Sequence, residues 1–297
     1  MKFKLIAIFG SFFALLFLAF TFLFYRHGVY FAGSPADLAS QLNQLPVVAD
    51  EVESPFVFHF EDRKTVEETR NMDRSSSAYW WVNSGGRLNI AGGMGSTVQG
   101  KLPASSRWRL AYSLQNPTDT DNGYHPQNIF RLVSRSKWKD FEQSAYFMIT
   151  WDNLSKSRNR NESNGLFLFS RYLDGDNLYY VGLRVDGTAV IKKKVKGTYH
   201  TLAQAAIFPG SYERDKKPNL LPHKRWIGVK SGLKTNADDT VSIKMYLDVG
   251  KTGEWTPVLE AVDDGARGGK PILKEGHAGI RTDFMDVRFD DWTAKNI

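Results

Sequence analysis

Polar and apolar residues alternate most regularly between residues 165 and 202. Three runs rich in β-branched and aromatic residues are separated there by Asp174-Gly175 and Asp186-Gly187. An alternation with a period of two places successive side chains on opposite faces of a strand, and Asp followed by Gly is typical of a tight turn. The pattern therefore predicts consecutive antiparallel strands with one face buried and the other facing water.

The register of this meander follows from two apolar residues, Leu183 and Ile191. If both face the core, residues 186–188 form a three-residue turn in which Gly187 takes a positive φ. The same register turns four residues to the opposite face: Tyr180, Arg184, Lys192 and Lys194. A slip by one residue would bury lysines, which is costly, so the register is strongly specified. The opposite face is thus predicted to be a basic, tyrosine-bearing outer surface suited to a glycan or another polyanion.

Short strand-like runs continue along the rest of the chain from residue 56. They lie at 56–60, 79–82, 87–90, 107–114, 145–151, 226–230, 241–249, 257–262 and 286–292. No long amphipathic helix interleaves them, which argues against a parallel βαβ arrangement. The series predicts an all-β fold, a two-sheet antiparallel jelly-roll sandwich formed by a single domain over residues 56–293.

The N-terminal segment has a different character. Residues 5–25 carry no charge and, as a helix, would span about 31 Å, close to the hydrocarbon thickness of a bilayer. We predict a single transmembrane helix here, with residues 1–4 in the cytoplasm because two lysines precede the apolar run. Residues 26–55 then form a stalk, with a short helix at 36–45, that carries an extracytoplasmic domain. The alternative is a cleaved signal peptide and a secreted protein.

Basic residues are concentrated in one stretch of the predicted domain. The 297-residue chain has a formal net charge of +7, while residues 184–230 contain eleven Lys and Arg against three Asp and Glu, a net +8. Such a stretch attracts an anionic polymer; the alternative is a solvated face whose lysines protect a sheet edge. No nucleic-acid motif accompanies it, so we expect no nucleic-acid partner. The lack of cysteine excludes disulfides, thiolate catalysis and cysteine-ligated zinc.

The order of these features resembles the concanavalin A-like lectin/glucanase superfamily, in its laminin-G-like bacterial forms. The likeness is carried by residues 58–62, 80–90, the meander, 226–232, 241–250 and 276–292. It implies a sandwich in which the first and last strands lie side by side. It also makes Asp62 and Asp290, with loop carbonyls near Gly85 and Gly86, candidates for a structural Ca²⁺ site. The alternative is that these are ordinary acidic residues at strand ends.

Two kinds of glycan chemistry bear on the prediction. Glycoside hydrolysis needs two positioned carboxyl groups, which the glucanases of this superfamily carry as Glu-x-Asp-x-x-Glu on one strand. That motif is absent, so we do not expect a retaining glucanase. A polysaccharide lyase instead needs a group that neutralises a uronate carboxylate and a Tyr, His or Lys that exchanges the proton. The meander offers such residue types without a recognisable lyase motif.

We therefore predict a membrane-anchored, extracytoplasmic, lectin-like domain that binds an acidic polysaccharide. The residues expected to line its groove are Tyr146, Arg171, Tyr180, Arg184, Lys192 and Lys194, and none is assigned a catalytic role. Two alternatives stay open: a lyase or atypical hydrolase acting on the same polymer, and a structural adhesion domain that contacts proteins. Asp119, Asp121 and Asn122 are interpreted as a polar turn, and His125 as a surface or capping residue.

Overall fold

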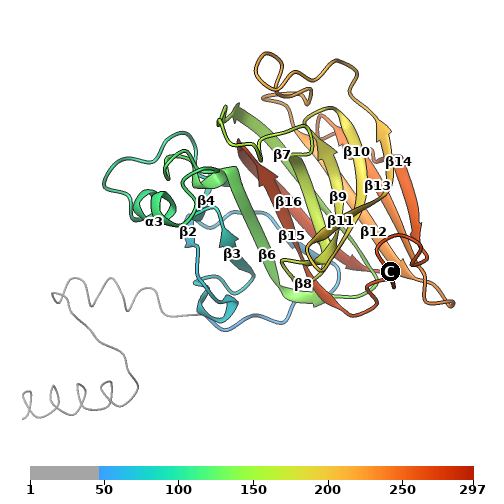
Figure 1. Ribbon diagram of the computed structural model, residues 1–297. Coiled ribbons are helices and arrows are strands. Elements are labelled where there is room, and N and C mark those ends of the chain that lie inside the picture. Colours follow the sequence, from blue (N-terminus) through green and yellow to red (C-terminus); the bar gives the residue numbers. More distant parts are fainter. Residues whose placement is uncertain (1–46) are drawn as a thin grey trace, which may run out of the picture. The chain divides into compact units, whose positions relative to one another are not determined.

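The computed structural model describes residues 47–297, which fold as two antiparallel β-sheets packed on one another (Figure 1). The described residues belong to one compact unit. Its first residues already pair with the domain, since the amide of Val47 donates to the carbonyl of Ser75 and the amide of Asp50 to that of Ala78. The predicted all-β, two-sheet architecture is confirmed.

Strands that are distant along the chain lie next to each other in both sheets. In hydrogen-bonded order, the nine-stranded sheet contains β14 (Thr256–Asp263), β13 (Val241–Val249), β12 (Ile227–Thr235), β7 (Phe141–Asp152), β16 (Met285–Asn296), β5 (Met94–Ser96), β4 (Arg87–Ala91) and β2 (Lys64–Glu67), with β1 (Phe56–Phe58) paired to β16. The seven-stranded sheet contains, in the same kind of order, β11 (Thr198–Ala206), β10 (Thr188–Val195), β9 (Asn177–Arg184), β8 (Gly165–Asp174), β15 (Gly276–Asp283), β6 (Ile129–Trp138) and β3 (Trp80–Ser84). The predicted neighbourhood of the first and last strands is confirmed by the pairing of β1 with β16.

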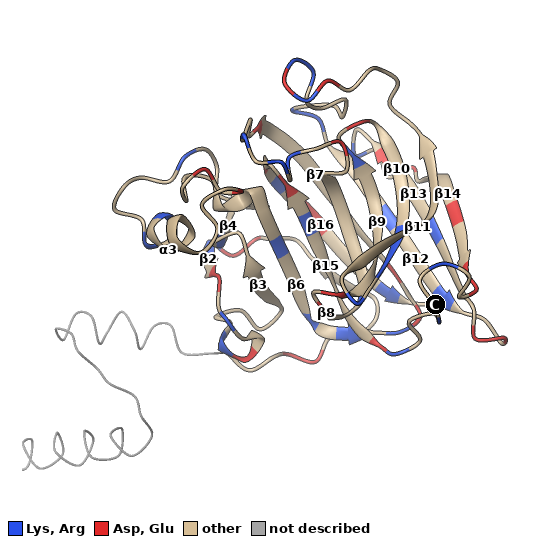
Figure 2. Cartoon of the chain, in the orientation of Figure 1, with Lys and Arg blue, Asp and Glu red and all other residues tan. Residues whose placement is uncertain are grey.

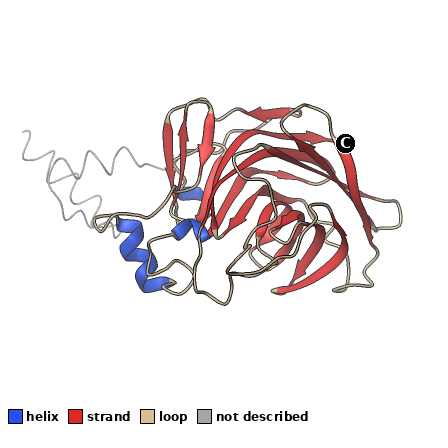
Figure 3. Cartoon of the chain, turned by 90° about the horizontal axis from the view of Figure 1, so that it is seen from above, coloured by secondary structure: helices blue, strands red, loops and turns tan. Residues whose placement is uncertain are grey.

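In the part of the chain that the structure describes, three short helices accompany the sheets: η1 (Met72–Arg74), α3 (Arg107–Gln115) and η2 (Pro126–Asn128). Figure 3 shows the sheets as two curved layers, with α3 beyond one end. The helix α3 corrects the strand predicted at 107–114. Its Trp108 and Tyr112 lie four residues apart, on one helical face, where Trp108 donates to Glu67 and Tyr112 to Glu68. A strand would also place these two side chains on one face, so the alternation does not distinguish the two structures.

The core lies between the sheets, and the meander β8 to β11 contributes one face to it. Leu183 and Ile191 are completely buried in this core, and Gly187 has a φ of 80°, as predicted. Across β9 and β10, Lys192 pairs with Tyr180 in the predicted register. The same register points the side chain of Lys193 inward, toward the buried side of the sheet, which the sequence pattern did not predict.

Within residues 47–297, no helix is long and apolar enough to cross a membrane. The transmembrane helix predicted at 5–25, the cytoplasmic residues 1–4 and the helix expected at 36–45 lie outside the described residues.

Candidate functional site

The six residues predicted to line one groove fall into three different environments. Four of them share the outer face of the seven-stranded sheet: Tyr180 and Arg184 on β9, and Lys192 and Lys194 on β10. Tyr146 lies on β7 in the other sheet, and Arg171 lies on β8 with its side chain fully buried. The predicted single groove is therefore wrong, while the four-residue face of the meander is confirmed as a set.

Tyr146 is held by contacts on the outer side of the nine-stranded sheet. Its hydroxyl donates to the Asp248 carboxylate at 2.8 Å, and its ring lies 5.5 Å from that of Trp255. Burial, followed by the hydrogen bond to Asp248, raises the pKa of Tyr146 well above its ordinary value. The side chain is thus occupied by neighbours of its own sheet and does not reach the face that carries Tyr180.

Arg171 has a structural role instead of the predicted binding role. Its guanidinium donates to the carbonyls of Lys139 and Ile272 and to the side chains of Asp140 and Thr235. Its φ of 47° belongs to an irregularity in the pairing of β8 with β9, which turns the side chain inward. A guanidinium with no exposed surface cannot meet a polymer from solution.

The outer face of the seven-stranded sheet contains a hollow of about 550 Å³. We call it the basic hollow, after the cations Lys192 and Arg281 that line it with the rings of Phe167, Tyr180 and Tyr199. The carboxylates of Asp119, Glu162 and Asp283 also line it. Arg281 on β15 donates to the hydroxyl of Tyr199 on β11 at 2.7 Å. These strands are four places apart in the sheet, about 19 Å if it were flat. The contact therefore requires the sheet to curve around this face and make it concave.

Tyr180 lies at the floor of the basic hollow, where the sequence pattern predicted an open surface. It is only 2% exposed, because the rings of Phe167, Phe169 and Tyr199 pack around it at 5.9–6.2 Å. Burial by itself raises the pKa of Tyr180. The nearby guanidinium groups of Arg281 and Arg131 outweigh that effect, so the pKa lies below its ordinary value.

Arg281 organises the positive charge of the basic hollow. Its Nε donates to Asp283 at 2.9 Å, and its Nη1 donates to Tyr199 and, at 3.3 Å, to Tyr180. Burial lowers the pKa of Arg281, but the Asp283 carboxylate and the two tyrosines more than reverse this and hold it well above its ordinary value. The guanidinium is therefore permanently charged, and its Nη2 makes no hydrogen bond to residues 47–297.

Lys192 provides a second cation at the basic hollow. Its ammonium lies 6.0 Å from the ring centre of Tyr199 and forms no ion pair with residues 47–297. Burial, followed by the charges of Arg184 and Arg281, lowers the pKa of Lys192. A partly buried ammonium without a carboxylate partner gains most from an anion that enters the hollow.

The other two predicted cations lie at the edge of this face and are already paired. Arg184 lies 2.7 Å from the carboxylate of Asp186, and Lys194 lies 3.2 Å from that of Asp176. The charges of the whole domain are spread over both sheets (Figure 2). The basic stretch 184–230 therefore does not form one continuous patch, and Arg281, which lies outside that stretch, is a member of the site that the sequence pattern did not predict.

Asp290, one residue of the predicted calcium pair, is engaged by a cation of the protein. Asp290 lies 2.5 Å from the ammonium of Lys251, and its neighbour Asp291 lies 2.7 Å from the ring of His59. No group of three or more His, Asp or Glu residues in the described chain could hold a metal ion. Asp62 is exposed at the end of the turn that follows β1. Lys251 and His59 thus engage the carboxylates of Asp290 and Asp291, and the calcium site expected at Asp62 and Asp290 stays a prediction.

Comparison with known proteins gives matches among solved structures alone, since no protein-family model and no curated protein matches the sequence. A β-glucanase from Bacillus licheniformis is 9% identical over 83% of this chain and 100% of that chain, with a TM-score of 0.44. A carbohydrate-binding module from Bacillus subtilis is 16% identical over 57% and 83% of the two chains, with a TM-score of 0.40. A Bacillus subtilis protein of unknown function with a galectin-like fold is 15% identical over 73% and 89%, with a TM-score of 0.41. These are the kinds of protein that the sequence resemblance names; at such identities and TM-scores they transfer neither an activity nor a ligand to this chain.

Proposed function

We propose that this protein binds an acidic polysaccharide, a polyuronate, in the basic hollow. The observation that carries the proposal is the pair of cations, Arg281 and Lys192, on a concave face floored by aromatic rings. A guanidinium and an ammonium form charge-assisted hydrogen bonds with carboxylates, and aromatic rings pack against the apolar face of a sugar. The proposal includes an N-terminal membrane anchor at 5–25 and an extracytoplasmic location of the domain.

The proposal predicts that replacing Lys192 weakens binding far more than replacing a lysine of the other sheet. Lys192→Met is expected to reduce affinity for polygalacturonate, alginate or hyaluronan about tenfold, because it removes the unpaired cation of the basic hollow. Lys244→Met, on β13, removes the same charge from an exposed strand position and should change affinity less than about twofold. Isothermal titration at two salt concentrations measures both, and the affinity of the parent should fall as salt rises.

Two results would overturn this function. One is a parent protein that binds none of these three uronate-containing polymers at low salt. The other is a Lys192→Met variant that binds as well as the Lys244→Met control. Neutral dextran serves as the negative ligand, because it offers sugar rings without a carboxylate.

A second candidate function, polyuronate lyase, is favoured by one observation, the lowered pKa of Tyr180 beside Arg281. In such an elimination a base takes the C5 proton, a cation neutralises the uronate carboxylate and the C4–O bond breaks to leave a C4=C5 double bond. The leaving oxygen takes up a proton, from the protonated base or from water, and departs as a hydroxyl. Tyr199 covers Tyr180, so its ring would have to move for the substrate to reach the hydroxyl. Absorbance of the unsaturated product tests this reaction: a lyase gives a rise that Tyr180→Phe abolishes, and a pure binding protein gives none.

A further inference from the structure

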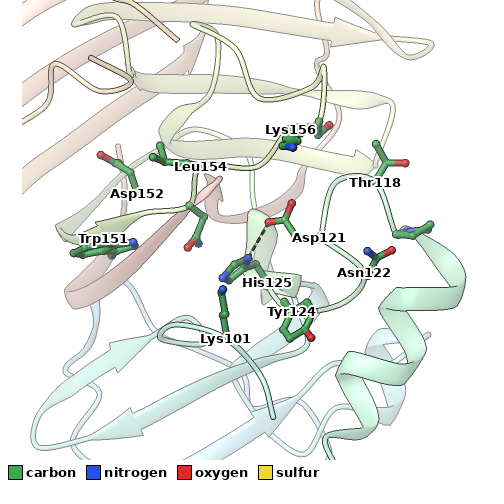
Figure 4. Close-up of a pocket in the computed structure, with 13 residues that line it drawn as sticks. Lys101, Thr118, Asp121, Asn122, Tyr124, His125, Trp151, Asp152, Leu154 and Lys156 are labelled. Atoms are coloured by element: carbon green, nitrogen blue, oxygen red, sulfur yellow. Dashed lines mark hydrogen bonds and ion pairs between the residues drawn. The ribbon is translucent and has the colours of Figure 1, made fainter. Parts of the chain in front are cut away.

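A second hollow, of about 880 Å³, lies near the end of β7 and is distinct from the basic hollow. One wall comes from Trp151 and the segment that follows β7, and the other comes from the loop after α3, residues 117–125 (Figure 4). We call it the tryptophan hollow. The sequence pattern of the loop predicts only a polar turn, and that of Trp151 only a position on a strand.

The first wall presents two large apolar side chains to solvent among polar residues. Trp151 is 67% exposed and Leu154 is 60% exposed, and both line the hollow. Trp151 is the penultimate residue of β7 and pairs with Asp286 of β16, so the sheet fixes its backbone while the indole stays free. An exposed indole beside a hollow of this size offers a flat surface on which the apolar face of a sugar ring can pack.

The centre of the tryptophan hollow is polar and held in place. His125 Nδ1 and the carboxylate of Asp121 are 2.8 Å apart, and this pair lies between Trp151 and Tyr124 in Figure 4. Asp121 itself has a φ of 51°, a left-handed conformation that turns its carboxylate back toward His125. Because Asp121 engages Nδ1, the imidazole is fixed in orientation, and its Nε2 is left to exchange hydrogen bonds with hydroxyl groups of a ligand.

Two ammonium groups lie at the edge of this hollow, which is also lined by the carboxylate of Asp152, itself 2.8 Å from the ring of His223. Lys101 and Lys156 both line it and are exposed, and neither forms an ion pair with residues 47–297. The guanidinium of Arg109 lies 4.0 Å from the ring centre of Tyr124, which fixes that ring at the second wall. A sugar that carries a carboxylate matches this combination of an indole, hydroxyl-binding groups and free ammonium groups.

A short bridge separates the two hollows. Asp119 accepts hydrogen bonds from the hydroxyl of Ser157 and, at 3.0 Å, from the amide of Asn159. Asp119 and Asn159 line the basic hollow, whereas Ser157 lines the tryptophan hollow. The two hollows therefore lie on opposite sides of one contact between two loops.

We propose that the tryptophan hollow is a second binding site for the same acidic polysaccharide, so that one chain crossing the Asp119 bridge occupies both hollows. This inference rests on the proposed function of the basic hollow. When one unit of the chain is held in the basic hollow, a later unit is presented to Trp151 at high effective concentration. A long oligomer then binds more tightly than a short one, without any further contact in the basic hollow.

The test compares uronate dimers with octamers prepared from polygalacturonate, alginate and hyaluronan. We expect the parent to bind the octamer of its preferred polymer at least about tenfold more tightly than the dimer. Trp151→Ala should remove most of that difference and leave the dimer affinity unchanged, and Leu154→Ala should reduce it partly. Leu114→Ala is the matched control, since Leu114 is 77% exposed on α3 and does not line this hollow.

The results separate this inference from the proposed function. If the parent binds dimer and octamer and Trp151→Ala leaves both affinities unchanged, the second site is refuted while the basic hollow stands. If the parent binds none of the oligomers, the proposed function fails and the second site falls with it. Nuclear magnetic resonance gives an independent check of a supporting result. The indole N–H resonance of Trp151 is assigned by its loss in Trp151→Phe. In the parent, this resonance should shift when the octamer is added and should not shift when the dimer is added.

Discussion

Replacing Lys193 with methionine is expected to lower the free energy of unfolding by about 3–5 kcal/mol. Its ammonium lies 2.8 Å from the Asp263 carboxylate and donates to the carbonyl of Gly269, and neither side chain of the ion pair is exposed. The hydroxyl of Tyr179 donates to the other oxygen of Asp263 at 2.6 Å. Without Lys193, the buried Asp263 carboxylate lacks the cation that compensates for its charge.

Two further variants make this prediction decisive. Lys194→Met changes the next residue, whose side chain points to the opposite face and whose ion pair reaches solvent, so it should cost about 1 kcal/mol or less. Lys193→Met combined with Asp263→Leu removes both charges and should recover much of the loss. Urea unfolding followed by tryptophan fluorescence gives the three values. Equal costs for Lys193→Met and Lys194→Met would show that the buried pair does not stabilise the fold as argued.

The meander shows how far the sequence predicts the fold. Alternation and the Asp-Gly turns are local signals, and they give the strands, the register and the residues on each face of β9 and β10. They do not explain why Lys193, in a run of three lysines, can point into the core. Its partner Asp263 lies 70 residues further along the chain, on β14, and no local pattern connects the two. A charged side chain can be buried only where an oppositely charged partner lies beside it, and the topology of the sheets decides which residues lie side by side.

The candidate site was predictable to a similar extent. Tyr180 and Lys192 belong to neighbouring strands of one meander, so the register places them together. Arg281 lies 101 residues from Tyr180 and reaches it because β15 is inserted between β8 and β6, which the sequence order does not indicate. The sequence held one signal for Arg281: it lies two residues before Asp283, so a strand places the two side chains on the same face. The curvature that turns an outer face into a concave one also arises from the whole sheet and not from any single strand.

Replacing Arg171 with methionine is the second change expected to cost about 3–5 kcal/mol of unfolding free energy. The substitution leaves the buried carbonyl of Ile272, the partly buried carbonyl of Lys139 and the side chain of Asp140 without their donor. Arg171→Lys should recover only part of the loss, because one ammonium cannot reproduce the planar set of donors that meets four acceptors.

The pH dependence of unfolding provides a specific signature of this contact. Burial raises the pKa of Asp140, but hydrogen bonds from Thr235 and the charge of Arg171 outweigh it, so the folded-state pKa lies below its ordinary value. A carboxyl with a depressed pKa contributes stability above its unfolded pKa and loses it as the pH falls through the folded pKa. In Arg171→Met the folded-state pKa of Asp140 should rise toward its unfolded value, so the stability that this carboxyl loses on acidification should be smaller than in the parent.

The same variant separates a structural arginine from a binding one. At a temperature and pH where Arg171→Met is still folded, its affinity for polyuronates should equal that of the parent, because the guanidinium is enclosed away from the basic hollow. Circular dichroism establishes the folded fraction, and titration with the preferred polyuronate gives the affinity. If folded Arg171→Met loses as much affinity for the polyuronate as Lys192→Met does, Arg171 contacts the polymer after all. If Arg171→Met instead keeps the affinity of the parent, the cations that contact the polymer are those on the concave side of the seven-stranded sheet.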